Sequence, residues 1–242
     1  MRKLDGARRH DILRLLGDRT GLVGVELGVA GGGFSKRMVD SGKFETFFGV
    51  DMYADTHDVD QYKDALRHVG LFAPYKLLRM SFAEAYDLFD DESLDFIYID
   101  GYAHTGQEGG ETIWHWARKV KPGGLIAGDD YHEDWPLVKE AVDLFAEVTR
   151  FELWVTTEVE PDVNYAAHPT WGMIKTGPVS GDPPSELVSR GKAASTRVAR
   201  KRAAAKRFDG WLQRIVGEKR YQELRQWNRA RKARRKSRKT GR

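Results

Sequence analysis

Short apolar segments that alternate with helix-forming stretches constrain the fold of this 242-residue chain more than any other feature. Such alternation predicts a parallel sheet with helices on both of its faces. Two late apolar segments have no helix pattern between them, which predicts an antiparallel addition at one edge of the sheet. The seven predicted strands are residues 22–27, 47–50, 75–78, 94–99, 125–127, 151–157 and 170–175. We therefore expect an α/β, doubly wound fold with a mostly parallel seven-stranded sheet and an antiparallel edge strand.

Glycines or carboxylates stand where several of these strands end. The first strand runs into the sequence GVAGGG, the second ends on Asp51, the fourth on Asp100, and the fifth on Asp129 and Asp130. In parallel α/β sheets ligands bind beyond the carboxyl ends of the strands. Asp51 follows Gly28 by 23 positions, a spacing that suits an acid for binding ribose hydroxyls. The sequence thus predicts one ligand site at this edge.

The glycine-rich sequence after the first strand allows backbone N–H groups to approach a ligand closely. Its spacing is not the G-x-G-x-x-G dinucleotide pattern, and no Gly-Lys-Ser or Gly-Lys-Thr occurs, so a Walker-type nucleotide site is not predicted. Glu26, an acid at the end of the first strand, distinguishes this loop from an ordinary turn. A purely structural glycine turn remains the alternative.

The charge of the chain is divided unevenly along its length. Residues 187–242 hold 21 of the 40 Lys and Arg residues but only 3 of the 36 Asp and Glu residues. We predict a domain at 1–176, a linker at 177–186 with the sequence GPVSGDPPSE, and a basic tail at 187–242 that is mostly helical or partly disordered. The tail is a solvated extension, or contacts an anionic partner (nucleic acid, anionic glycan or membrane surface), or docks on the acidic body or a neighbouring subunit of a homo-oligomer.

Cysteine is absent, which excludes disulfides and thiolate chemistry. No apolar run approaches the roughly 18 residues of a membrane span, and the basic start of the chain lacks an apolar signal-peptide segment. Residues 5–17 instead predict a short amphipathic helix. We expect a cytoplasmic protein without a transmembrane segment.

The sequences VGVELGVAGGGFS, FFGVDMY, DFIYIDGYAH and VKPGGLIAGDDY together resemble those of class I S-adenosylmethionine (SAM)-dependent methyltransferases. The resemblance covers about residues 10–176. On the sequence GDDYHEDWPLVKEAVDLF it is closest to a bacterial branch of macrocin-type O-methyltransferases and cephalosporin-hydroxylase-like proteins. It implies a Rossmann-like fold and methyl transfer to a hydroxyl of a sugar or small natural product.

The resemblance also implies where SAM would lie. Glu26, Gly28 and Gly32 would line its methionine part, Asp51 would hold its ribose, and residues 80–82 would contact adenine. The cofactor-binding residues implied in this way are Glu26, Gly28, Val29, Gly32, Phe34, Ser35, Asp51, Met52, Ser81, Phe82 and Asp100.

A divalent cation, Mg²⁺, is implied as well, with Asp100, Asp129 and Asp130 as ligands. Carboxylates suit a hard cation, and three of them would repel one another without one. The catalytic residues are then Asp100 and a base that removes the proton of the acceptor hydroxyl: His104, His132, or water or another residue. His104 stands four residues after Asp100, whereas the branch usually places its histidine three residues after the aspartate.

Two other functions are kept as alternatives. A nucleic-acid (RNA) methyltransferase could use the basic tail for binding, although Asp-Gly-Tyr-Ala stands where adenine-N6 enzymes carry Asn/Asp-Pro-Pro-aromatic, and the body has no basic stripe with aromatic residues. A non-catalytic SAM-fold binding protein is the other. The joint presence of Glu26, Asp51 and the three later aspartates argues against it.

Overall fold

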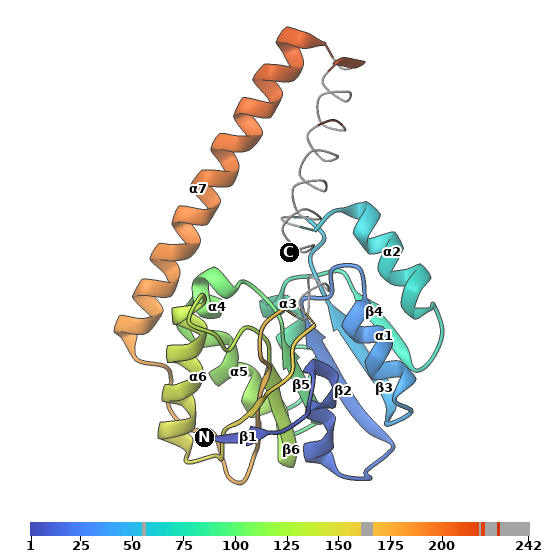
Figure 1. Cartoon of the computed structure of the whole chain (residues 1–242), viewed down its shortest axis with the longest axis vertical. Coiled ribbons are helices and arrows are strands. Elements are labelled where there is room, and N and C mark those ends of the chain that lie inside the picture. Colours follow the sequence, from blue (N-terminus) through green and yellow to red (C-terminus); the bar gives the residue numbers. More distant parts are fainter. Residues whose placement is uncertain (55–56, 161–166, 218, 221–226, 228–242) are drawn as a thin grey trace. The chain divides into compact units, whose positions relative to one another are not determined.

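A sheet of eight strands lies at the centre of residues 1–194 in the computed structural model (Figure 1). The structure describes residues 1–54, 57–160, 167–217, 219–220 and 227. The strands are β1 (Arg2–Leu4), β2 (Leu22–Leu27), β3 (Phe44–Val50), β4 (Tyr75–Leu78), β5 (Leu94–Ile99), β6 (Val120–Gly128), β7 (Trp154–Thr156) and β8 (Trp171–Ile174). The helices are η1 (Arg9–Leu16), α1 (Gly33–Asp40), α2 (Val59–Val69), α3 (Phe82–Tyr86), η2 (Ala103–Thr105), α4 (Gly106–Gly109), α5 (Glu111–Lys119), α6 (Pro136–Thr149) and α7 (Ser185–Val216).

The predicted α/β fold is confirmed. The strand order is β1-β7-β8-β6-β5-β2-β3-β4, and β8 is antiparallel to both of its neighbours while the other pairs are parallel. The sheet has eight strands instead of seven because β1, which is too short to show a period, pairs with β7. The antiparallel strand β8 is therefore the third strand from that edge of the sheet, and β1 is the edge strand.

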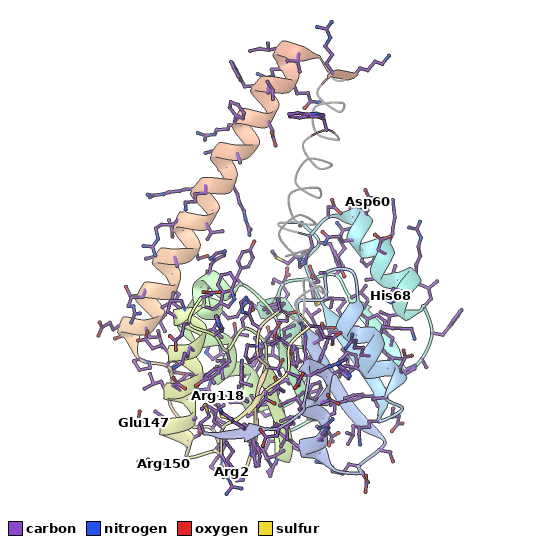
Figure 2. All side chains as sticks on the ribbon, viewed as in Figure 1. Arg2, Asp60, His68, Arg118, Glu147 and Arg150 are labelled. Atoms are coloured by element: carbon purple, nitrogen blue, oxygen red, sulfur yellow. The ribbon has the colours of Figure 1, made fainter. Side chains whose placement is uncertain are left out.

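The two faces of the sheet bury two separate apolar cores. Along β5, Ile97 and Ile99 face the core that contains the α5 and α6 side chains, whereas Phe96 and Tyr98 face the core formed with η1 and α1. This alternation follows from the two-residue period of a strand. In Figure 1, α1 and α2 lie on one side of the sheet and α5 and α6 on the other. Figure 2 shows the labelled polar residues Asp60 and His68 of α2 on the outside of this body.

The sequence Lys121-Pro122-Gly123-Gly124 forms a bulge within β6. Leu94 of β5 pairs with Val120, but Phe96 pairs already with Leu125, so residues 121–124 protrude from the ladder. Gly123 supplies the positive φ of 79° that this excursion needs.

The backbone ladder continues one residue past the ends of the central strands, which aligns the predicted site residues at one edge. Each of these residues donates its N–H to a carbonyl of the neighbouring strand. The bonds are Gly28 to Val50 at 2.9 Å, Asp51 to Leu78 at 3.1 Å, Asp100 to Leu27 at 2.8 Å and Asp129 to Ile99 at 3.0 Å.

The C-terminal part begins inside the first compact unit. The chain divides into residues 1–194 and 195–242. Leu187 of α7 is buried, and Arg190 forms a bidentate pair with Glu140 of α6 at 2.6 and 2.7 Å. In the second unit the described residues of α7 expose Phe208 and Trp211 among basic side chains. Beyond α7, only residues 217, 219–220 and 227 of the predicted tail belong to the described part of the chain. Within the described ranges, none of the helices is both long and apolar enough to cross a membrane.

Candidate active site at the carboxyl edge of the sheet

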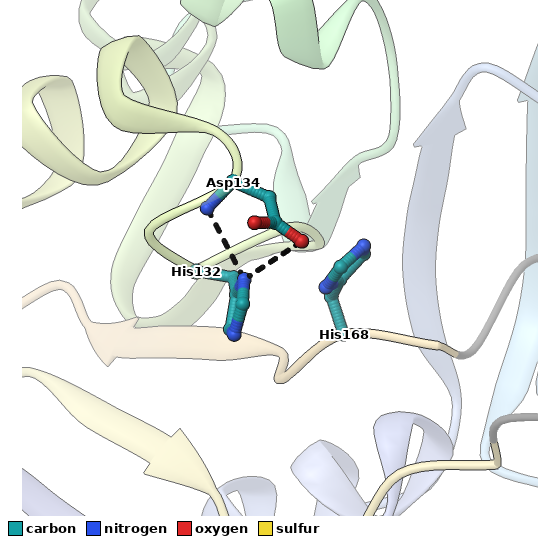
Figure 3. Close-up of side chains that lie close together, drawn as sticks. All are labelled: His132, Asp134 and His168. Carbon is teal, nitrogen blue, oxygen red and sulfur yellow. Dashed lines mark hydrogen bonds and ion pairs between the residues drawn. The ribbon is translucent and has the colours of Figure 1, made fainter.

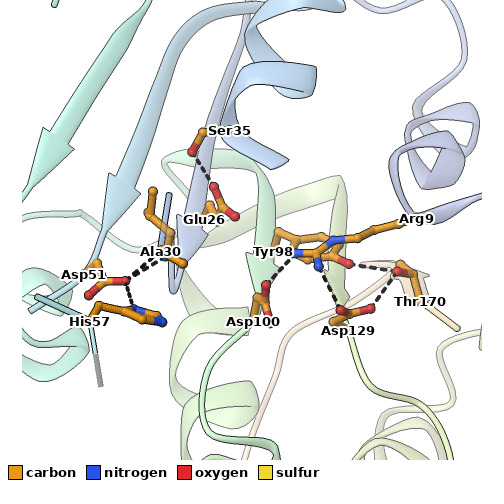
Figure 4. Close-up of polar contacts among 11 residues, drawn as sticks. Arg9, Glu26, Ala30, Ser35, Asp51, His57, Tyr98, Asp100, Asp129 and Thr170 are labelled. Carbon is orange, nitrogen blue, oxygen red and sulfur yellow. Dashed lines mark hydrogen bonds and ion pairs between the residues drawn. The ribbon is translucent and has the colours of Figure 1, made fainter. Parts of the chain in front are cut away.

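Asp51 fastens the glycine-rich loop to the end of β3 (Figure 4). The N–H groups of Val29 and Ala30 both donate to Oδ2 of Asp51 at 3.0 Å, and the N–H of Tyr53 donates to Oδ1 at 3.0 Å. His57 Nδ1 lies 2.6 Å from the same Oδ2. Burial alone would raise the pKa of Asp51, but the hydrogen bonds from His57 and the backbone outweigh it and lower the pKa. The carboxylate therefore stays ionised and is already an acceptor before any ligand binds.

Glu26 is buried, and its carboxyl is hydrogen-bonded by the hydroxyl of Ser35 from α1. The Ser35 hydroxyl also lies 3.1 Å from that of Tyr75. Burial raises the pKa of Glu26 to about 8, although the bond from Ser35 and the charge of Arg9 both act to lower it. Glu26 is consequently mostly protonated at pH 7. Its predicted role toward the methionine part of SAM stays a prediction.

We expect Glu26→Gln to change how stability depends on pH. In the wild type, the unfolded chain loses this proton near the ordinary pKa of about 4.3, while the folded protein keeps it up to about 8. Folding is therefore opposed increasingly as pH rises through this window, by at most about 1.4 kcal/mol per pH unit. Glutamine removes the effect, so the free energy of unfolding of Glu26→Gln relative to wild type should increase across the window and level off above it.

Urea unfolding measured at intervals between about pH 5 and about pH 8 checks this result. Glu147→Gln, on the exposed side of α6 (Figure 2), is the matched control and should follow the wild-type curve. Parallel curves for Glu26→Gln and wild type would show that Glu26 is ionised in the folded protein.

Arg9 is the functional residue that the sequence analysis missed. Its Nη2 lies 2.5 Å from Oδ2 of Asp100 and its Nη1 lies 2.8 Å from Oδ2 of Asp129, and the side chain is only 2% exposed. The guanidinium also lies over the rings of Phe34 and Tyr98, at 4.7 and 4.9 Å. Burial would lower the pKa of Arg9, but the two aspartates outweigh it, and the pKa rises. A permanent cation thus stands beside the carboxylates.

The three carboxylates predicted as metal ligands do converge. Asp100, Asp129 and Asp130 each offer one oxygen, and these atoms lie within 4.8 Å of one another. Both carboxylate oxygens of Asp129 have hydrogen-bond partners, because Thr170 donates to Oδ1 at 3.2 Å while Arg9 donates to Oδ2. Burial raises the pKa of Asp129 to about 7 and that of Asp130 to about 8, and repulsion from the neighbouring carboxylates adds to both.

A cavity of about 20 Å³ adjoins these carboxylates. Gln107, Val138 and Trp171 contribute to its lining together with Asp100 and Asp130. It has room for one water-sized group or ion. The oxygen donors and the available space fit Mg²⁺, whereas the charge of Arg9 already neutralises part of the cluster.

The two candidate base residues lie in different surroundings. His104 is exposed on η2, and its ring packs edge-on against Trp135 with centroids 4.7 Å apart. In the described part of the chain His104 makes no hydrogen bond or ion pair. His132 faces Asp134 and His168 instead. Among the described residues, neither imidazole therefore forms a hydrogen bond to a carboxylate of the aspartate cluster.

Several residues implied as cofactor contacts have structural partners of their own. Ser81 caps α3 by accepting from the N–H of Glu84 at 3.2 Å. Phe34 is buried and stacks on Tyr98, with centroids 3.9 Å apart. Met52 is 39% exposed. Their roles toward SAM stay predictions.

Left-handed backbone at residues other than glycine gathers at this edge. Each such residue is strained by about 1–2 kcal/mol, and strain of this kind concentrates at functional sites. In the loops after β2, β3, β5 and β6 the residues with positive φ are Ala30, Tyr53, Gln107, Glu108 and Asp130. The carboxyl edge is therefore the best candidate for an active site.

A family model matches the part of the chain that forms this edge. Residues 23–131 match the model of a family described as a methyltransferase domain. This part of the chain resembles a methyltransferase domain. The match begins in β2 and ends just after the aspartate pair, so it includes the glycine-rich loop and all of the aspartates described above. No curated protein matches the chain by sequence.

Solved structures share the fold of residues 1–194. Cofactor-bound Rv0187 from MTB matches with a TM-score of 0.54 and 11% identity, over 69% of this chain and 78% of its own. A putative O-methyltransferase from Klebsiella pneumoniae matches with a TM-score of 0.52 and 16% identity, over 69% and 77%. Spermidine synthase from Thermotoga maritima matches with a TM-score of 0.53 and 16% identity, over 71% and 60%.

At these identities the likeness shows the fold and not the reaction. The domain match and the fold together support a class I SAM-dependent methyltransferase. Neither distinguishes the macrocin-type branch from others.

Proposed function

We propose that this protein transfers the methyl group of SAM to a hydroxyl of a sugar or small natural product, and that Mg²⁺ held by Asp100, Asp129 and Asp130 assists. The observation that carries the proposal is the convergence of these three carboxylates beside a glycine-rich loop that Asp51 holds in place. A loop of this kind suits a bound nucleoside, and the oxygen-rich cluster suits a hard cation with an acceptor oxygen.

Each residue then has a definite task. Asp51 is ionised and faces the glycine-rich loop. Its carboxylate accepts hydrogen bonds from the ribose hydroxyls, which take the place of His57. Arg9 fixes the orientation of Asp100 and Asp129 through its two nitrogens. When bound, Mg²⁺ makes a coordinated hydroxyl more acidic.

The acceptor oxygen forms a bond to the methyl carbon while the carbon–sulfur bond of SAM breaks and its electron pair stays on sulfur. S-adenosylhomocysteine leaves, and the hydroxyl proton passes to a base. His104 is proposed as this base, because its ring is exposed toward solvent and is fixed by the edge of Trp135.

We expect methyl transfer to require added Mg²⁺. Incubation with SAM and a panel of sugars and phenols, read by mass spectrometry for the addition of one methylene mass, should give product with Mg²⁺ and lose it in excess chelator. SAM binding measured by calorimetry should persist in chelator, because the loop and Asp51 need no metal. Full turnover in chelator would remove Mg²⁺ from the proposal while leaving methyl transfer intact.

His104→Ala and His132→Ala form a matched pair in the same assay. Loss of a general base lowers turnover by about 10²–10⁴-fold. That loss is expected for His104→Ala with SAM affinity retained. The opposite pattern would assign the proton transfer to His132.

A further inference from the structure

A second group of metal-ligating side chains lies apart from the aspartate cluster. His132 and Asp134 come from the loop after β6, and His168 comes from the segment before β8 (Figure 3). One ligand atom from each of the three lies within 4.8 Å of the others. Two loops distant in sequence therefore present two imidazoles and one carboxylate to the same point.

The contacts of His132 show a lone pair facing a carboxylate. The N–H of Asp134 donates to Nδ1 of His132 at 3.2 Å, so this nitrogen is drawn as an acceptor. The same Nδ1 lies 3.4 Å from Oδ2 of Asp134. One nitrogen cannot accept from the amide and donate to the carboxylate at once. A metal ion bound to this nitrogen would replace the amide hydrogen bond and could take the carboxylate oxygen as a second ligand.

His168 supplies a third ligand atom at the same point. Its ring centroid is 4.9 Å from that of His132 and the two rings are tilted by 36°, so a second imidazole lies beside the first. A divalent metal uses both imidazoles and the carboxylate as ligands. Imidazole nitrogen suits zinc and related transition metals, whereas Mg²⁺ prefers oxygen. Three protein ligands also leave the fourth tetrahedral position open.

We propose that His132, Asp134 and His168 form a binding site for a divalent transition metal of the zinc class, separate from the aspartate cluster. Trp135 packs edge-on against both His104 and His168, so this site adjoins the candidate base. As a metal ligand, His132 is no longer free to act as a general base. The site requires neither SAM nor Mg²⁺, and it therefore goes beyond the proposed methyl transfer.

Co²⁺ is the probe for this site, since its visible absorption reports on nitrogen ligands and four-coordinate geometry. Full-length protein without a histidine tag is stripped with chelator and titrated with Co²⁺, and then with Zn²⁺ in competition. One equivalent of Co²⁺ should produce ligand-field bands that Zn²⁺ abolishes. His168→Ala should weaken Co²⁺ binding by at least about 10-fold, as loss even of an outer-shell partner commonly does.

Two further variants locate the metal. His115→Ala removes an exposed histidine of α5 and should leave Co²⁺ affinity unchanged. Asp130→Asn alters the aspartate cluster and should leave the ligand-field bands in place. Loss of the bands in Asp130→Asn with retention in His168→Ala overturns the proposal, as does the absence of Co²⁺ binding by wild type. SAM binding by the same samples shows separately whether the methyltransferase site is intact.

Discussion

Gly28→Ala is expected to lower SAM affinity by at least about 100-fold and the free energy of unfolding by about 2–4 kcal/mol. Gly28 has φ of 100°, which an L side chain rarely adopts. A Cβ there would lie 1.9 Å from the carbonyl oxygen of Asp100. That oxygen belongs to backbone, so it cannot rotate away as the end of a side chain could. The alanine variant must separate the ends of β2 and β5 and displace Asp100.

Gly31→Ala is the matched control in the same loop. A Cβ at Gly31 has no atom within 4 Å, and the residue has no positive φ. Its effect on stability should stay within about 0.5 kcal/mol. Thermal unfolding and SAM titration of both variants provide the measurement. Equal SAM affinity and equal stability for the two variants would show that the close approach at Gly28 does not shape the site.

The sequence predicted the sheet well because its signals were local. The strand at residues 94–99 was predicted with the bounds that the structure has, since the apolar run at residues 96–99 ends sharply on Asp100. The shared edge of Asp51, Asp100 and Asp129 followed from strand alternation alone. Features that depend on pairing between distant segments were missed. β1 shows no period over three residues, and the bulge at 121–124 is defined only by its register with β5.

The site itself was predicted less completely, for the same reason. Arg9 follows another arginine in a short basic segment, and nothing in the sequence marks it as the one that reaches a carboxylate 91 positions away. His57 likewise lies in a loop without a motif. The resemblance indicated which residues face the cofactor in relatives, but local packing also determines what each one contacts. Ser81 shows this, because its hydroxyl caps a helix.

Arg9 also changes the meaning of the aspartate cluster. The repulsion among three carboxylates was an argument for a metal, yet the chain supplies a cation of its own. A bound Mg²⁺ would share Asp100 and Asp129 with Arg9, and it would rely more on Asp130 and on the remaining oxygen of Asp100. A variant without Arg9 therefore tests whether Mg²⁺ can supply positive charge to these carboxylates in place of the guanidinium.

Arg9→Met is expected to destabilise the protein by about 3–5 kcal/mol in metal-free buffer, because it leaves two carboxylates without their buried partner. Methionine keeps the contact with Phe34 and Tyr98, so the loss reports mainly on charge. If the cluster binds Mg²⁺, the metal replaces the missing charge, and added Mg²⁺ should raise the melting temperature of Arg9→Met more than that of wild type.

Arg14→Met is the control for this comparison, since Arg14 lies in the same η1, is 52% exposed, and pairs only with Asp11 at 3.2 Å among the described residues. An exposed pair of this kind contributes about 0–1 kcal/mol, so its loss should change little and Mg²⁺ should not compensate for it. An equal response of Arg9→Met and Arg14→Met to Mg²⁺ would argue that the aspartates at this edge bind Arg9 and not a metal. The catalytic role of the cluster would then be to hold the guanidinium beside the reacting groups.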